Sequence, residues 1–164
     1  MTRNLAVIAV ALVVLLLWRL MFVGWRARSA RQSDVAAPAA VPEALRRNAS
    51  DGVEATYVST TSAGDWLDRI TVHGLGARSA ARVLVDPVGV LIARTGAPDV
   101  FVPVAALREV RRETMRAGKA LAGGGLVVVE WQLGERAVAT ALSPRHEPGA
   151  LAAAVSALIT AGRS

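Results

Sequence analysis

Residues 5–25 read LAVIAVALVVLLLWRLMFVGW, and this stretch divides the chain into a hydrophobic N-terminal segment and a β-rich remainder. From Leu5 to Trp18 every side chain is aliphatic or aromatic, and Arg19 is the single charge within the stretch. A helix of this length spans roughly 30 Å, about the hydrocarbon thickness of a bilayer. A helix also satisfies its own backbone hydrogen bonds, as lipid requires. We therefore expect a transmembrane anchor over residues 1–25.

Aromatic and basic residues mark the C-terminal end of this helix as a membrane interface. Tryptophan anchors at the level of the lipid headgroups, and a long arginine stem extends toward them. Only Arg3 precedes the helix, whereas several arginines follow it, so the positive-inside rule places the C-terminal portion in the cytoplasm. We expect a single-pass protein of the cell membrane. The predicted interface residues are Trp18, Arg19, Trp25, Arg26, Arg28 and Arg31.

A cleaved signal peptide is the alternative interpretation of this N-terminal segment. Its apolar core would normally be about 7–15 residues long and would be followed by a small-x-small cleavage site. Here the apolar stretch is longer, and the sequence after it is GWRARSARQ, which is crowded with tryptophan and arginine. The anchor is therefore the favoured interpretation.

The composition limits the possible partners and cofactors. The chain has no cysteine, so neither disulfides nor thiolate metal sites can form. Residues 1–52 carry seven arginines against three acidic residues, whereas the remainder carries twelve basic and ten acidic residues. The positive charge therefore belongs mainly to the membrane flank, where it favours contact with anionic lipid. Few aromatic side chains are present to stack on bases, so we expect no nucleic-acid partner.

Residues 26–52 are rich in alanine, proline, serine and charge, without a sustained apolar period. This composition predicts a flexible linker. Pro42 suits the first turn of a helix, so one or two helical turns over residues 42–47 are an alternative.

Residues 53–164 predict one mainly-β domain. Short apolar alternations separated by turn signals are typical of antiparallel strands, and Asp86-Pro87-Val88-Gly89 predicts a tight hairpin. Residues 105–115 fit a helix as well as a strand, and we favour a strand over 108–113. A stripe of Leu151, Val155, Leu158 and Ile159 predicts a helix over about 148–161. We expect a small antiparallel barrel of two bent sheets, capped by this helix. The expected strands are 54–60, 66–73, 80–86, 90–94, 100–104, 108–113, 126–132 and 137–142.

Three stretches carry a resemblance to a known family. They are YVSTTSAGDWLDRITVHGLGAR (57–78), APDVFVPVAALREVR (97–111) and GGGLVVVEW (123–131). Together with the N-terminal anchor, they resemble a family of actinobacterial membrane proteins with a PH-like domain. The resemblance covers residues 56–159 and implies a PH-like fold on a single membrane anchor. Members of the family are named as export or transport proteins, and their genes tend to lie beside pyrimidine-biosynthesis genes.

The sequence carries no catalytic constellation. Gly118-Lys119 lacks the glycine and the serine or threonine that a phosphate-binding loop needs around it. No serine lies in a GxSxG context, and His73 and His146 are the only imidazoles. We therefore expect no enzyme activity, no cofactor, no metal site and no small-molecule substrate.

The stretch from Ala63 to Arg69 is the most unusual part of the domain, because a turn, two acids, a tryptophan and an arginine follow one another. One interpretation is a recognition edge with Trp66 as the anchor. The other is structural, with Asp65 turning the chain, Trp66 in the core, and Asp68 and Arg69 as an exposed pair. The candidate binding residues are Asp65, Trp66, Asp68, Arg69, His73 and Arg78.

These observations predict a membrane-anchored PH-like module that binds or scaffolds at the cytoplasmic membrane face. Its partners would be the lipid bilayer and a protein, or a second copy of the chain, with exposed strand edges available for β-augmentation. The alternative is an accessory subunit of an export or transport system.

Overall fold

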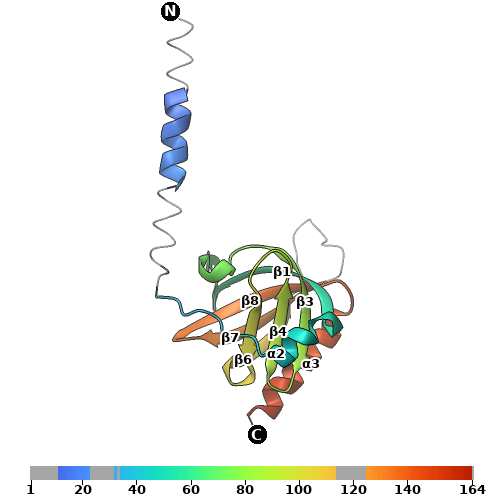
Figure 1. Cartoon of the computed structure of the whole chain (residues 1–164). Coiled ribbons are helices and arrows are strands. Elements are labelled where there is room, and N and C mark those ends of the chain that lie inside the picture. Colours follow the sequence, from blue (N-terminus) through green and yellow to red (C-terminus); the bar gives the residue numbers. More distant parts are fainter. Residues whose placement is uncertain (1–10, 23–31, 33, 114–124, 164) are drawn as a thin grey trace, which may run out of the picture. The chain divides into compact units, whose positions relative to one another are not determined.

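The computed structural model describes residues 11–22, 32, 34–113 and 125–163 (Figure 1). The chain divides into two compact units, Met1–Asp34 and Val35–Ser164. In the first unit, residues 11–22 are helical, and their large apolar side chains, Trp18 among them, are exposed. Within the described part of the chain, no helix is both long enough and apolar enough to cross a membrane. The rest of the predicted anchor, including Trp25, lies outside the described residues, and so do the predicted interface residues Arg26, Arg28 and Arg31.

The second unit is built on a single antiparallel sheet, with strand order β5-β4-β3-β1-β8-β7-β6 and with β2 paired to β1 outside this order (Figure 1). The mainly-β prediction is confirmed, including the strand favoured over residues 108–113. The glycine-rich sequence of residues 116–125 leads us to expect a loop there, and of these residues only Gly125 lies within the described part of the chain. The strands are β1 (Val53–Ser62), β2 (Asp65–Arg69), β3 (Ser79–Asp86), β4 (Gly89–Arg94), β5 (Val100–Pro103), β6 (Leu107–Glu113), β7 (Leu126–Leu133) and β8 (Arg136–Pro144).

The predicted small barrel of two bent sheets is wrong, because the strands form one sheet that is open between its two end strands. Among the described strands, β5 and β6 do not pair with each other, and the short helix η3 (Val104–Ala106) joins them. Helix α3 (Pro148–Ala161) packs chiefly against β6 and also contacts β3, β7 and β8. The helix therefore fills the opening that strand pairing would otherwise have to close.

The main core lies between the concave face of the sheet and α3. The helix buries Leu151, Val155 and Ile159, which is the stripe that the sequence predicts, with Pro148 in its first turn. In the sheet, Trp131 of β7 lies opposite Val138 of β8, and both are buried. Burial of this apolar surface is the main favourable contribution to folding.

A second, smaller core covers the other face of β4 and β5. Leu91 and Phe101 are buried there by Leu45 of helix α2 (Glu43–Arg47), which lies before a short helix, η1 (Ala49–Asp51). Residue Ala39 also forms an antiparallel bridge with Phe101. Residues 35–52, which we expected to belong to a flexible linker, thus pack against the sheet. They do so because the outward side chains of β4 and β5 are apolar and need a cover.

A chain of hydrogen bonds crosses the interior of the main core. Trp131 Nε1 donates to Thr140 Oγ1 at 2.9 Å, and Thr140 Oγ1 and Thr60 Oγ1 are 2.7 Å apart. Thr60 Oγ1 lies 2.7 Å from the Tyr57 hydroxyl, which donates to the Leu75 carbonyl at 2.7 Å. Each hydroxyl has one proton, so the bonds must all run in one direction, from Trp131 to Leu75. Every group in the chain is thereby satisfied.

Because Tyr57 is buried in this chain of hydrogen bonds, the free energy of unfolding should depend on pH in the alkaline range. Burial raises the pKa of Tyr57 above 10.0, although the Thr60 hydroxyl and the charges of Arg94 and Arg69 act to lower it. A raised folded pKa contributes stability that is complete below pH 10.0 and is lost as the pH rises through the raised value. We expect the free energy of unfolding, measured by denaturant titration below and above pH 10.0, to show this loss. The Tyr57→Phe variant should lack that part of the pH dependence; an identical slope in both proteins would contradict the assignment.

Candidate functional site

Among the described residues of the Val35–Ser164 unit, the β1–β2 hairpin presents the most exposed large apolar side chains. Trp66 is 81% exposed and Leu67 is 70% exposed. We call Asp65, Trp66, Leu67, Asp68 and Arg69 the hairpin patch. The interpretation of Trp66 as a core residue is wrong, since its side chain points away from the core. A pair of apolar side chains in this position is typical of a contact surface.

The exposure of the patch follows from the pairing of the two strands. Thr61 lies opposite Arg69 and Ser62 lies opposite Asp65, so one step along β1 corresponds to four steps along β2. The three residues between, 66–68, have no partner in β1 and form a bulge. A bulge turns side chains away from the regular alternation of a strand, and here it brings both Trp66 and Leu67 into solvent.

Local hydrogen bonds fix the shape of the bulge. The Asp65 carboxylate accepts bonds from the backbone N–H groups of Leu67 at 2.9 Å and Asp68 at 3.3 Å. The Ser62 hydroxyl donates to the Asp68 carboxylate. Gly64 has φ of 82°, a left-handed conformation that suits glycine at the turn before β2. Asp65 therefore turns the chain, as the structural interpretation predicted. Its hydrogen bonds also fix the conformation of the hairpin patch.

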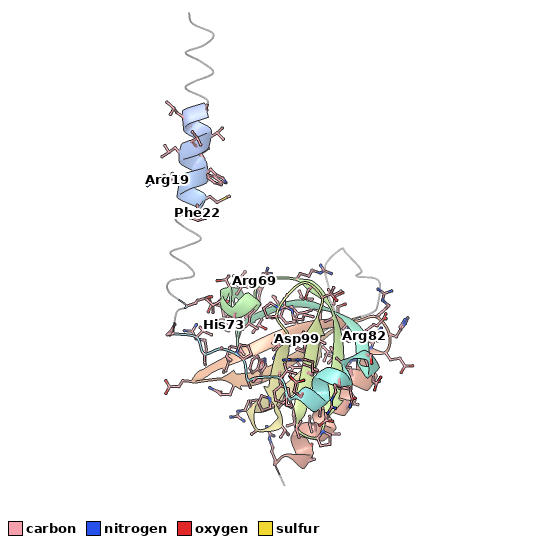
Figure 2. All side chains as sticks on the ribbon, in the orientation of Figure 1. Arg19, Phe22, Arg69, His73, Arg82 and Asp99 are labelled. Carbon is pink, nitrogen blue, oxygen red and sulfur yellow. The ribbon has the colours of Figure 1, made fainter. Side chains whose placement is uncertain are left out.

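Arg69 is the last residue of β2 and His73 lies in the short helix η2 (Val72–Gly74); Figure 2 labels both. Arg69 Nη1 donates to the Gly76 carbonyl at 3.5 Å, which ties the end of β2 to the next loop. His73 Nε2 lies 2.8 Å from the Val35 carbonyl oxygen, so this nitrogen carries the proton and donates. This hydrogen bond attaches the segment before α2 to the η2 turn, so His73 has a structural role.

Arg78 lies elsewhere, in a cleft of about 810 Å³ on the convex face of the sheet. We call this the outer cleft. Arg78 was a predicted binding residue, whereas Arg82, Arg94 and Arg145, which also line the cleft, were missed because the sequence shows no dense basic cluster. The lining residues are Ala49, Ser50, Glu54, Ala55, Thr56, Arg78, Ala80, Ala81, Arg82, Ala93, Arg94, Thr95, Ser143 and Arg145.

Arg94 is among the lining residues, but its side chain lies on the core face of the sheet, because it pairs with the buried Ala81. Its guanidinium donates to Ser79 Oγ and to the carbonyls of Gly74, Ala77 and Pro98, at distances between 2.6 and 3.3 Å. Its Cζ atom lies 3.9 Å from the centroid of the Tyr57 ring. Burial lowers the pKa of Arg94, while Tyr57 and Asp99 act to raise it. All of these contacts lie within the fold. The Arg94 side chain therefore connects β4 to β1 and to the η2 loop.

The described residues hold no group of three or more histidine, aspartate or glutamate side chains that could bind a metal ion. No constellation of nucleophile, base and orienting acid is assembled among the residues that the structure describes.

Comparison with known proteins agrees with this architecture. A family model described as bacterial PH domain-like matches residues 35–157, whereas no curated protein matches the chain. The match confirms the PH-like domain implied by the resemblance, and it begins at the same residue as the second compact unit. Because the matched region covers well over half of the sequence, the chain belongs to the bacterial PH domain-like family.

Proposed function

We propose that the protein is a membrane-anchored PH-like module that binds a protein partner through the hairpin patch, at the cytoplasmic face of the cell membrane. The observation that carries this proposal is the bulge at residues 66–68, which exposes Trp66 and Leu67 on a fixed hairpin. PH-like domains are generally non-catalytic binding modules, which favours a binding role over an enzymatic one.

The hairpin patch is a better contact surface than the two ends of the sheet. At one end, the bridge between Ala39 and Phe101 occupies the edge of β5. At the other end, α3 packs against β6, and Arg163 donates a hydrogen bond of 2.7 Å to the Arg108 carbonyl. An added strand would have to displace these contacts, so β-augmentation at either end is disfavoured.

The membrane location rests on the sequence of the first unit. Residues 11–22 place apolar side chains on the surface of a helix, interrupted only by Arg19, and such a helix favours an apolar environment. Arginines in the flank after this helix favour the cytoplasmic side.

Protease treatment of sealed membrane vesicles tests this orientation. We expect the Val35–Ser164 unit to be protected in right-side-out vesicles and digested in inverted ones. The side of the membrane on which the domain lies decides which partners it can meet. Digestion from outside in right-side-out vesicles would overturn the cytoplasmic assignment. Release of the domain without its N-terminal segment would overturn the anchor.

Site-specific crosslinking in intact membranes tests the partner surface. A photoreactive amino acid at position 66 should give a discrete protein adduct, whereas the same group at position 88 should not. Val88 is the matched control because it is 49% exposed on another hairpin turn. The added change Leu67→Ser should reduce the adduct from position 66 while altering the free energy of unfolding by less than about 0.5 kcal/mol.

The identity of the adduct separates the alternatives. An adduct with a second copy of the chain indicates self-association, and an adduct with a protein of several membrane spans supports the accessory role in export or transport. Equal adducts from positions 66 and 88, or none from position 66, would contradict the assignment of the hairpin patch.

A further inference from the structure

The outer cleft has a floor of small side chains between arginine walls. Alanines and short hydroxyl residues of β1, β3, β4 and β8 form its base, and η1 borders it through Ala49 and Ser50. Its volume of about 810 Å³ lies within the range of small-molecule binding sites, and it is larger than one phosphate ion requires. No residue of the hairpin patch lines it, so the two surfaces are separate.

Arg82 holds the wall of the cleft in place. One terminal nitrogen donates to the carbonyls of Ser50 at 3.0 Å and Gly52 at 3.2 Å, and the other forms an ion pair of 2.7 Å with Glu54. These bonds attach η1 to the sheet. Three of the five N–H donors of Arg82 are used in this way, so it contributes charge to the cleft and at most two donors to a ligand.

Arg78 and Arg145 have donors left for a ligand. Arg145 approaches Glu54 only through Nε, at 3.5 Å, and its side chain is 70% exposed, so its terminal nitrogens face solvent. Arg78 is exposed, and within the described ranges it has no hydrogen bond or ion pair. The hydroxyls of Thr56, Thr95 and Ser143 also line the cleft. Glu54 is the single carboxylate among the lining residues, against Arg78, Arg82 and Arg145, since the Arg94 guanidinium is turned toward the Tyr57 ring in the core.

We propose that the outer cleft binds a small molecule or headgroup that carries phosphate groups. The planar guanidinium forks of Arg78 and Arg145 match the geometry of phosphate oxygens, and the hydroxyls supply further donors. The excess of arginine over glutamate favours a ligand with more than one negative charge. The lining contains no aromatic ring, so a stacked nucleobase is not the expected body of the ligand.

Calorimetric titration of the full-length protein with inorganic pyrophosphate tests the site. The protein is held in nanodiscs of phosphatidylcholine. We expect saturable binding with one ligand per chain, weakened about tenfold or more in the double variant Arg78→Gln/Arg145→Gln. The control is Arg108→Gln/Arg112→Gln, which removes the same charge from β6, outside the cleft, and should bind as the unchanged protein does.

Two results would overturn the proposal. One is the absence of saturable binding to the unchanged protein, and the other is equal weakening in both double variants. Comparison of thermal unfolding midpoints ensures that the variants are folded, and both sets of substituted side chains are exposed.

The source of the phosphate is found by adding phosphatidic acid to the same nanodiscs. Competition with pyrophosphate identifies a lipid headgroup as the ligand, whereas an unchanged pyrophosphate affinity identifies a soluble phosphorylated molecule. Each of these results supports the site. Crosslinking from position 66 is independent of this titration, so failure of either proposal leaves the other standing.

Discussion

Replacing Arg94 with methionine is expected to lower the free energy of unfolding by about 3 kcal/mol, the largest effect of any substitution considered. The variant keeps a long apolar stem but removes the bonds to Gly74, Ala77 and Pro98. Three backbone carbonyls then lose their donor, and the cation over the Tyr57 ring is also lost. Denaturant titration of the two proteins measures the difference.

Two control variants show whether the geometry of the guanidinium is responsible. Arg94→Lys keeps the charge but has no planar fork, so it should recover less than half of the loss. Arg108→Met removes a 2.9 Å bond to the Ala105 carbonyl at an exposed position, and it should change stability by less than about 0.5 kcal/mol. Similar decreases in the free energy of unfolding for Arg94→Met and Arg108→Met would contradict the stabilising role of the buried Arg94 hydrogen bonds.

Replacing Thr140 with valine is expected to lower the free energy of unfolding by about 2 kcal/mol, although the side-chain volume is nearly unchanged. Thr140 accepts from Trp131 and donates to Thr60 in the interior chain of hydrogen bonds. Valine leaves the Trp131 N–H without an acceptor and Thr60 without a donor. Both groups are buried, so water does not replace the lost partner.

The variant Thr140→Ser separates hydrogen bonding from packing. Serine keeps the hydroxyl and removes one methyl group, which costs about 1 kcal/mol in a well-packed core. Thr140→Val should therefore be the more destabilising of the two substitutions in denaturant titration. If serine proved as harmful as valine or worse, packing rather than the directional chain would explain the importance of this position.

Local signals in the sequence predicted the elements well. The turn at residues 86–89 joins β3 to β4 as expected, and Pro103 lies in the end strand β5, where a missing donor is tolerated. Helix α3 begins at Pro148, and its apolar stripe is buried. In each case neighbouring residues alone determine the outcome, because turn chemistry and periodicity act over only a few positions.

Features that depend on distant contacts could not be predicted. Whether the sheet closes depends on the distance between β5 and β6 after α3 has packed, and no local pattern reports it. The exposure of Trp66 results from a pairing register with β1, and an alternating pattern alone suggested burial. The outer cleft brings Arg78 and Arg82, at β3, together with Arg145, which follows β8.

The packing of residues 35–51 on the sheet has a practical consequence for shortened versions of the protein. A version that begins at Val53, where the strand pattern starts, would lose Leu45 and leave Leu91 and Phe101 in water. It would also uncover the backbone of β5 beside Phe101, an open template on which a second molecule can add its own strand. Such a fragment would aggregate, whereas one that begins at Val35 carries its own protective cover.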